Sequence, residues 1–464
     1  MASEITRRAA KAMGLFGSMQ VVQVVCAMVR NMVISKWLGP VGLGLMGVYL
    51  TAVDLIGSVT QLGIRTSAVK EIASGDLAAV TVVRRFGVAL GILGAVVAVV
   101  LSLPMSRWSF GDDSHVWSFC LLGAALLFQS LTNAGQAVFQ GLSRLKPLAS
   151  ASLWGSVAGL ALSVPLYRWL GLGGIAPSIV VYSVALWVPL ALHGRGLDRS
   201  AGRSLGLRQT VARGAEFMKV GFYLTLSSIL GYLVSYVFLI FLNREGSEMT
   251  QGIYQAGYTM LWRYAAMIFV SVTYEYYPRL TRVSAFPRRM QAMVNHQSFF
   301  TALIMLPCVC FAIAASPLIV RVLYQSEFMP VLPYFTVGMA GMMFRPLSVA
   351  MSYSFLATGR GLTYSVTEMA SSVVGLALNV AGFHWFGFAG LGVALIGWMG
   401  ADVLIMYVFY RRMNLRINRR VALISAGMVA IVLVCALLQL AGLWWAVAAA
   451  GAVALLPAVR FFRS

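Results

Sequence analysis

Charged side chains are scarce in this sequence, and acidic ones are the scarcest. Of its 464 residues, 11% are charged, with 14 Asp and Glu against 35 Lys and Arg. A soluble globular domain is about a quarter charged, so this composition excludes one. Hydrophobic residues make up 60% of the chain. Because apolar runs long enough to cross a bilayer must satisfy their backbone internally, we predict an all-α polytopic membrane protein.

Metal-ligand and nucleotide-binding patterns are also missing. The five cysteines form no C-x-x-C pair and the four histidines are scattered, so we predict no metal site and no cofactor. No G-x-x-x-x-G-K-[ST] segment is present, which argues against ATP as a driver. The net charge of +21 lies mostly in short loops, where it favours membrane lipids as partners rather than nucleic acid.

Long apolar runs divide the chain into spans. A bilayer core needs about 20 apolar residues per helix, and scanning with that length gives about 14 candidates. Their approximate ranges are 14–36, 42–64, 86–105, 116–138, 148–169, 172–194, 219–242, 253–277, 298–317, 330–357, 362–384, 387–410, 421–440 and 443–460.

Lys and Arg gather on alternate connections between these spans. One side carries clusters such as Arg84-Arg85 and Arg411-Arg412, whereas the other carries isolated charges such as Lys36 and Arg168. Basic loops stay in the cytoplasm, so we predict that both termini are cytoplasmic. The N-terminal segment runs directly into the first span, and we expect that span to stay uncleaved.

An internal repeat relates the two halves. VAGLALSVPLYRWLGLGG at 157–174 matches VVGLALNVAGFHWFGFAG at 373–390, and Arg144 matches Arg360 at the same offset. The matched spans are six apart, so the repeats are parallel, as in transporters with a path between two lobes. We therefore predict two six-helix lobes around a central cavity, followed by two C-terminal helices. The expected segments are an N-lobe (1–200), an amphipathic cytoplasmic linker (201–218), a C-lobe (219–412) and the last two spans (413–464).

Seven ionisable residues fall within or beside the spans: Arg30, Asp54, Arg263, Glu275, Arg345, Glu368 and Asp402. A charge at a helix centre costs about 2.5–3.5 kcal/mol even on the insertion scale, so such residues face a bundle interior or a watery cavity. The arginines suit phosphate, because a guanidinium keeps its charge and offers a fork of donors. Pairing with a carboxylate between helices is the alternative. Asp54, Glu368 and Asp402 are candidates for coupling to H⁺ or Na⁺.

The predicted eighth span is aromatic. Tyr254, Tyr258 and Trp262 recur at four-residue spacing near Gln251 and Gln255, which predicts a shared helix face. Rings beside amides suit sugars, whereas an interfacial aromatic belt is the competing interpretation. The predicted substrate-binding set is Arg30, Arg263, Arg345, Tyr254, Gln255, Tyr258 and Trp262, with no catalytic residue.

The chain resembles a known family in three segments. ISKWLGPVGLGLMGVYL at 34–50 with LGIRTSAVKEIAS at 62–74, GIYQAGYTMLWRYAAMIFVSVTYEYYPRLTRV at 252–283, and VTEMASSVVGLALN at 366–379 resemble Wzx-type O-antigen flippases. That family belongs to the multidrug/oligosaccharidyl-lipid/polysaccharide exporter superfamily. The resemblance covers about residues 10–412, and its strength lies in the order and spacing of the segments.

The resemblance implies a function. Such proteins move an undecaprenyl-diphosphate-linked repeat unit from the cytoplasmic to the periplasmic leaflet of the bacterial inner membrane by alternating access, in lipopolysaccharide and O-antigen biosynthesis. It further implies a monomer, ion or potential coupling, and a glycan polymerase as a possible partner complex. Family members commonly have twelve spans, so the last two here are a departure.

Three other functions compete with this one. A cation-coupled multidrug exporter of the same superfamily would favour an acidic or aromatic cavity, and the three membrane arginines argue against it. A lipid II flippase can also have fourteen spans. A membrane glycan polymerase or ligase would be an enzyme, with Asp112-Asp113 as its metal site. We predict no enzyme, because enzymes of that kind usually carry a large outer domain.

Overall fold

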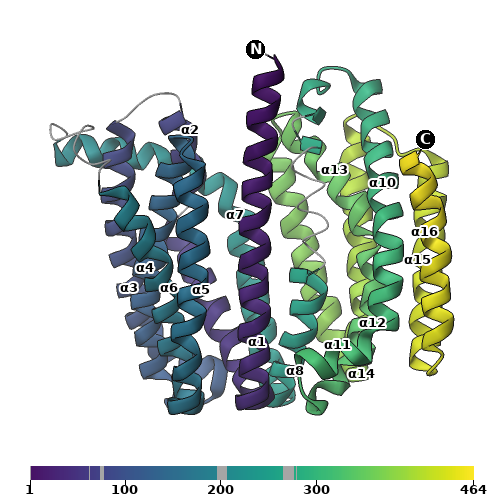
Figure 1. Cartoon of the computed structure of the whole chain (residues 1–464), viewed down its shortest axis with the longest axis horizontal. Helices are drawn as coiled ribbons and strands as arrows, with labels where there is room; N and C mark the ends of the chain where they lie inside the picture. The colour runs from purple at the N-terminus through teal and green to yellow at the C-terminus, as the bar shows by residue number, and fades with distance from the viewer. Residues whose placement is uncertain are drawn as a thin grey trace. The chain divides into compact units, whose positions relative to one another are not determined.

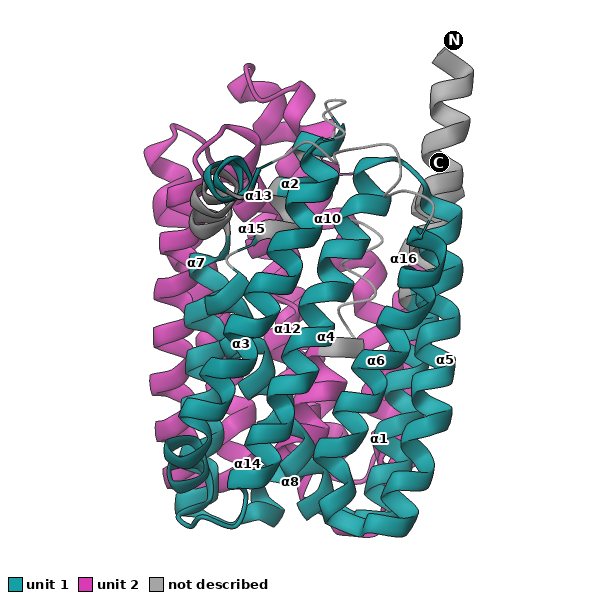
Figure 2. Cartoon of the chain, turned by 90° about the vertical axis from the view of Figure 1, so that its left-hand side faces the viewer, with its two compact units in different colours: residues 1–252 teal, residues 253–464 magenta. Residues whose placement is uncertain are grey.

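The computed structural model describes residues 2–61, 63–73, 78–195, 206–264, 276–277 and 279–463. Every regular element in these ranges is a helix, and they contain no strand (Figure 1). The chain forms two compact units, residues 1–252 and 253–464 (Figure 2). Each unit is described by itself below.

The first unit is built from seven helices and the start of an eighth. They are α1 (Ala2–Gln61), α2 (Ile64–Ala73), α3 (Ala78–Phe110), α4 (Val116–Gly141), α5 (Leu145–Leu170), α6 (Ile175–Gly194) and α7 (Leu207–Glu245), followed by α8 (Glu248–Tyr258). A short 3₁₀ turn, η1 (Gly171–Gly174), joins α5 to α6.

The second unit begins inside α8. It continues with the π-helical segment η2 (Thr259–Tyr264), then α10 (Pro287–Ala314), α11 (Ser316–Leu323), the 3₁₀ segment η3 (Ser326–Val331), α12 (Leu332–Met342), α13 (Arg345–Ala357), α14 (Gly361–Arg412), α15 (Arg419–Leu440) and α16 (Trp444–Arg463).

The longest helices each contain two membrane crossings. α14 has 52 residues, or about 78 Å at 1.5 Å per residue, against a hydrocarbon core of about 30 Å. It breaks at Gly387, where φ is 58°. α1 breaks in the same way at Gly39, with φ 66°, and Pro40 then starts the second half. Glycine adopts positive φ freely, and proline fits the first turn of a helix.

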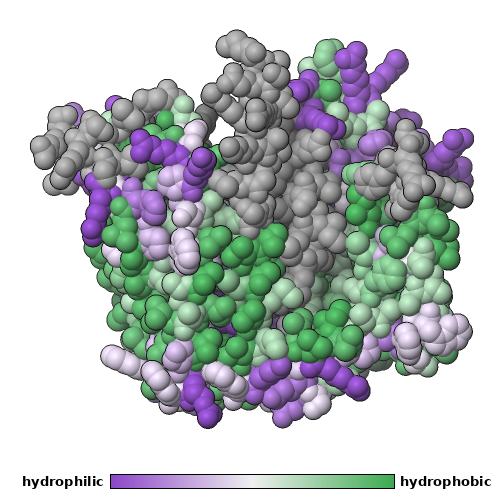
Figure 3. All heavy atoms as spheres, viewed as in Figure 1, coloured by the Kyte–Doolittle hydropathy of each residue, from purple (hydrophilic) through white to green (hydrophobic). Residues whose placement is uncertain are grey.

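The predicted fold class is confirmed. Eight helical runs are long and apolar enough to span a membrane, and the runs of 41, 50 and 52 residues hold two crossings each. In the described part of the chain these make eleven crossings, and α16 and the α12–α13 pair are further apolar helices, which is consistent with the predicted number of about 14. Within each unit, hydrophobic side chains cover the middle of the helices and hydrophilic ones gather at their ends (Figure 3).

The predicted internal repeat appears in the backbone angles. Gly171 ends α5 at φ 58° and ψ −133°, and its counterpart Gly387 breaks α14 at φ 58° and ψ −138°. Arg144 and Arg360 both precede their helices in nearly the same conformation, with φ −88° and −90°. The two sequence matches therefore encode the same pair of helices with the same break between them.

One predicted span differs from the structure. The span predicted at 330–357 is two helices, α12 and α13, because Pro346 has no N–H for the carbonyl of Met342 and disfavours helical geometry before it. The amphipathic linker predicted at 201–218 lies partly outside the described residues, and its part from Leu207 onward begins α7.

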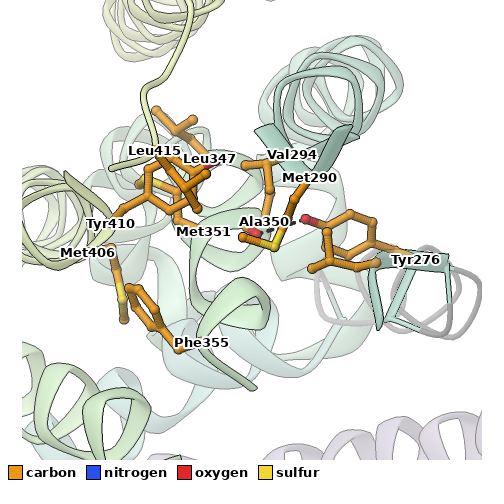
Figure 4. Packing of buried hydrophobic residues seen from close by; sticks show 11 residues of the cluster. Tyr276, Met290, Val294, Leu347, Ala350, Met351, Phe355, Met406, Tyr410 and Leu415 are labelled. Atoms are coloured by element: carbon orange, nitrogen blue, oxygen red, sulfur yellow. Dashed lines mark hydrogen bonds between the residues drawn. The ribbon is translucent and has the colours of Figure 1, made fainter. Parts of the chain in front are cut away.

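A packed cluster holds α10, α13 and the second half of α14 together. Its buried side chains include Met290, Met351, Phe355 and Met406 (Figure 4). The hydroxyl of Tyr276 donates a hydrogen bond to the carbonyl of Ala350 at 2.9 Å. In a bilayer, such packing stabilises mainly through van der Waals contact. The cluster fixes α13, which begins with Arg345, against the half of α14 that carries Asp402.

The connection between α3 and α4 is fastened to α1. The hydroxyl of Tyr49 on α1 lies 2.8 Å from Nδ1 of His115. The ring centroids of Phe110 and His115 are 4.0 Å apart. Burial lowers the pKa of His115, against the opposing influence of Glu248 and Asp112. The neutral imidazole is therefore favoured in the folded unit.

We expect acidification to weaken this unit. The unfolded chain takes up the proton near pH 6.5, above the folded pKa of His115, so this contribution to stability is complete above that pH and is lost as the pH falls. Thermal unfolding of the purified protein at pH 8 and pH 5 measures the effect. His115→Gln should reduce the difference in Tm between the two pH values, and an unchanged difference would contradict the assignment to His115.

Candidate functional site

The second unit gathers most of the residues predicted for substrate binding and ion coupling. Tyr254, Gln255 and Tyr258 lie on α8, Trp262 lies in η2, and Arg345 begins α13. Glu368 and Asp402 lie on the two halves of α14. The side chain of Arg263 and the whole of Glu275 lie outside the described residues.

Aromatic rings form a continuous ladder in this unit. Tyr254 and Tyr258 have ring centroids 5.9 Å apart, and Tyr258 and Trp262 are 6.2 Å apart, so the predicted shared face is present. The ladder extends from Trp262 to Trp398 of α14 at 5.2 Å. At its other end, Tyr254 stacks on Tyr334 at 5.6 Å. Tyr254 and Tyr334 are buried, so only the partly exposed rings of Tyr258 and Trp262 could meet a sugar. Trp262 lies in the π-helical segment η2, and such geometry is frequent at functional sites.

Arg345 lies between this ladder and two carboxylates. Its guanidinium carbon is 5.4 Å from the centre of the Trp262 ring, within the range of a cation–π contact. Its Nη1 is 3.9 Å from Oδ2 of Asp402, which is an ion pair too long for a hydrogen bond. Glu368 interacts electrostatically with both Arg345 and Asp402. We call Arg345, Glu368, Asp402 and Trp262 the Arg345 cluster.

Asp402 is the most deeply buried member of the cluster. It is 1% exposed, and among the described residues neither of its carboxylate oxygens has a hydrogen-bond partner. A buried carboxylate without hydrogen bonds is costly, and a loose ion pair offsets only part of that cost.

The sequence predictions missed three members of the surroundings. Trp398 donates a hydrogen bond from its indole nitrogen to Oγ of Ser371 at 3.1 Å, and Tyr364 interacts electrostatically with Glu368, Arg345 and Asp402. A signal for two of them was present. Trp398 and Tyr364 each precede a predicted carboxylate by four residues, the spacing that places side chains on one helix face.

Gln251 has a structural contact that the sequence did not indicate. Its amide nitrogen donates a hydrogen bond to the carbonyl of Leu239 at 2.8 Å, and the side chain is fully buried. It therefore fastens α8 to α7 within the first unit. Gln255 is half-buried.

The first unit contains its own membrane arginine. Arg30 of α1 is 9% exposed, and its guanidinium carbon lies 5.6 Å from the centre of the Tyr182 ring of α6. Its Nε has no hydrogen-bond partner in the part of the chain that the structure describes. Asp54 lies half-buried on the second half of α1. Arg30 thus repeats the pairing of an arginine with an aromatic face that Arg345 shows in the second unit.

The acidic pair considered as an enzyme metal site is occupied by protein partners. Arg107 donates two hydrogen bonds to Asp113, at 2.7 and 3.0 Å, and these lower the pKa of that carboxyl. Ser114 donates to Asp112 through its hydroxyl and its backbone N–H, which lowers the pKa of Asp112. The described residues contain no group of three or more potential metal ligands.

The fold is shared with solved transporters. An inward-facing multidrug resistance MATE family transporter of the MOP superfamily matches with a TM-score of 0.70 and 14% identity, over 84% of this chain and 94% of that one. The lipid II flippase MurJ, in an inward closed conformation, matches with a TM-score of 0.68 and 13% identity, over 97% of this chain and 98% of that one. A MOP superfamily transporter from Pyrococcus furiosus matches with a TM-score of 0.58 and 16% identity, over 91% and 96%.

The chain therefore has the fold of the solved MOP superfamily transporters. No curated protein sequence matches it. The profile of the family described as "Polysaccharide biosynthesis protein" matches residues 33–333. Since this match covers more than half of the sequence, the chain belongs to that polysaccharide biosynthesis family.

Proposed function

We propose that this protein is a flippase that moves undecaprenyl-diphosphate-linked oligosaccharide repeat units from the cytoplasmic to the periplasmic leaflet by alternating access. The observation that carries the proposal is the Arg345 cluster, a fixed cation beside an aromatic ladder on membrane helices. A guanidinium suits a diphosphate and aromatic faces suit sugars, so one surface offers contacts to both parts of the head group. Membership of a polysaccharide biosynthesis family supports this substrate class.

Asp402 and the diphosphate would compete for the guanidinium of Arg345. Coupling to H⁺ or Na⁺ through Asp402 and Glu368 belongs to the same proposal. A transporter must bind its substrate differently in its two states, because equal affinity in both shifts nothing. A contact between Arg345 and Asp402 that differs between the two states would provide such a difference.

The remaining predictions belong to the same proposal. Arg30, Arg263 and Gln255 would contribute further contacts to the head group, and Asp54 would be a second coupling site. The distribution of Lys and Arg supports a multi-pass protein of the bacterial inner membrane with both termini in the cytoplasm. The protein would work as a monomer without a cofactor, as a transporter and not an enzyme, supplying lipid-linked repeat units to a glycan polymerase.

A lipid II flippase is the second candidate. The match with the MurJ fold covers 97% of this chain. The unmatched 3% is fewer residues than α15 and α16 contain, since these helices have 22 and 20 residues. The likeness in fold thus extends into the two helices that exceed the twelve of common O-antigen flippases. Lipid II is also an undecaprenyl-diphosphate-linked sugar, so the Arg345 cluster fits it equally well.

Complementation separates the two candidates. The chain is expressed in one bacterium that lacks its O-antigen flippase and in another that is depleted of its lipid II flippase. Restored surface glycan in the first, with loss of accumulated lipid-linked repeat units, is the expected result. Restored growth in the second alone would assign the lipid II function. Restoration of neither, together with efflux of a cationic dye by reconstituted protein, would contradict the proposal and favour a drug exporter.

The same assay tests Arg263. With membrane abundance matched, Arg263→Ala is expected to reduce surface glycan at least tenfold, because a guanidinium–phosphate contact is worth about 1.5–3 kcal/mol. Full export by this variant would exclude a substrate contact for Arg263.

A further inference from the structure

A groove lies on the first unit between α3, α4 and α6. Its volume is about 230 Å³, and its walls include Val88, Leu131, Trp187 and Leu190. From Phe139 to Leu131 the wall follows α4 for eight residues, or about 12 Å along the helix axis. The groove is therefore long enough for the glycerol backbone of a lipid and the first carbons of an acyl chain.

Two arginines line one end of this groove. Arg84 lies near the start of α3, and Arg195 follows the last residue of α6. Nη2 of Arg84 donates a hydrogen bond to the carbonyl of Gly194 at 3.1 Å, where a cation is also favoured by the helix dipole. A Cβ atom at residue 194 would approach that Nη2 to 2.9 Å, so glycine keeps the guanidinium in this place. The lining residues, all within the described part of the chain, include no carboxylate.

The surroundings of the groove are exposed and apolar. Val88 is 44% exposed, and Val188 and Leu192 of α6 are 39% and 51% exposed. On a membrane helix, exposed aliphatic side chains of this kind are in contact with lipid tails. The groove thus combines an apolar, lipid-facing wall with two fixed positive charges at one end, and its arginines lie at the end that carries the basic connections.

We propose that this Arg84–Arg195 groove binds an anionic glycerophospholipid of the surrounding bilayer, with its phosphate between the two arginines and the start of one acyl chain along Leu131, Trp187 and Leu190. Basic pockets between membrane helices at the cytoplasmic side recognise lipid headgroups in this manner. The site is separate from the Arg345 cluster, which lies in the other unit. It would be a resident lipid site and not a transport site.

Native mass spectrometry of the delipidated full-length protein tests the proposal, with phosphatidylglycerol as the probe and phosphatidylcholine as the zwitterionic comparison. We expect one phosphatidylglycerol to bind more tightly than phosphatidylcholine. Arg84→Gln or Arg195→Gln should weaken it about fivefold, and both together about thirtyfold. Arg195→Gln leaves the contact between Arg84 and Gly194 intact, so it tests charge without disturbing the helix end. Arg168→Gln, which removes an exposed arginine of the same unit, is the matched control and should bind like the wild type.

Fluorescence locates the bound lipid. Brominated phosphatidylglycerol should quench tryptophan emission, and Trp187→Phe should remove part of that quenching. Affinity in the double variant equal to that of Arg168→Gln, or equal binding of the two lipids, would overturn the proposal. Selective loss of undecaprenyl diphosphate binding in the arginine variants, with phosphatidylglycerol unaffected, would also overturn it and assign the groove to the transported lipid.

Discussion

Arg345→Ala is expected to lower both the membrane abundance of the protein and its export activity, and a second change, Asp402→Asn, is expected to restore abundance alone. Asp402 is 1% exposed, and Arg345 is its ion-pair partner at 3.9 Å. Removal of Arg345 leaves the buried carboxylate of Asp402 uncompensated. Breaking a fully buried pair costs about 3–5 kcal/mol, and this loose pair with a partly exposed arginine should cost less. Asparagine removes that charge at nearly the same volume, but it does not return a cation to the aromatic ladder.

The measurements are quantitative immunoblotting of membranes, thermal unfolding of the purified variants, and surface glycan in the flippase-deleted strain. Arg321→Ala, at an exposed position on α11, controls for the loss of any arginine and should leave all three unchanged. Export restored to the wild-type level in Arg345→Ala with Asp402→Asn would show that Arg345 only neutralises Asp402. Unchanged abundance and export in the single variant would exclude both roles.

Arg345→Lys distinguishes charge from geometry. Lysine keeps a positive charge near Asp402, so abundance should stay close to that of the wild type. An ammonium group lacks the planar fork of donors and the stacking surface of a guanidinium, so export should fall at matched abundance. Equal export by the lysine variant would mean that a point charge is sufficient and that the contact with Trp262 is dispensable.

The spans and the repeat could be predicted because they depend on local properties of the chain. Apolar length determines whether a helix can cross a bilayer, and the match of 157–174 with 373–390 depended on residues within one hairpin. The structure gives the reason for the glycines in that match, since Gly171 and Gly387 adopt almost the same positive-φ conformation. The sequence also carried a local signal for the helix break at Phe344, because Pro346 follows two residues later. The prediction missed it because the apolar run continues through the break.

The composition of the Arg345 cluster was only partly predictable. The energetic cost of a charge in the membrane singled out Arg345, Glu368 and Asp402 one by one. The ion pair, however, joins Arg345 to Asp402, which is 57 residues further along the chain and on another helix. Sequence spacing reports neighbours on one helix and is silent about which helices pack together. For that reason substrate binding and ion coupling were assigned to separate residues, whereas the structure brings them together. Gln251 illustrates the same limit, because its partner Leu239 is on another helix.

Gly174→Ala and Gly390→Ala are expected to be strongly destabilising single-methyl changes in their units. The two positions correspond in the repeat, each three residues after the break. A Cβ atom would overlap the carbonyl oxygen of Leu166 in the first case and that of Gly382 in the second, and Leu166 and Gly382 also correspond. Backbone cannot move aside as a flexible side chain can, so each substitution should cost about 3 kcal/mol or more. The hairpin would open at its tightest point.

The consequences should differ between the two units. Gly390→Ala displaces the half of α14 that carries Asp402 from the half that carries Glu368, so it should impair export even where protein remains in the membrane. Gly174→Ala disturbs the hairpin of α5 and α6, on which Tyr182 lies against Arg30. Thermal unfolding and export at matched abundance measure both effects. Gly173→Ala is the neighbouring control, since a Cβ atom there meets nothing within 4 Å. A fall in Tm for Gly173→Ala as large as that for Gly174→Ala would show that the hairpin needs glycine for backbone freedom and not for the close approach of its two helices.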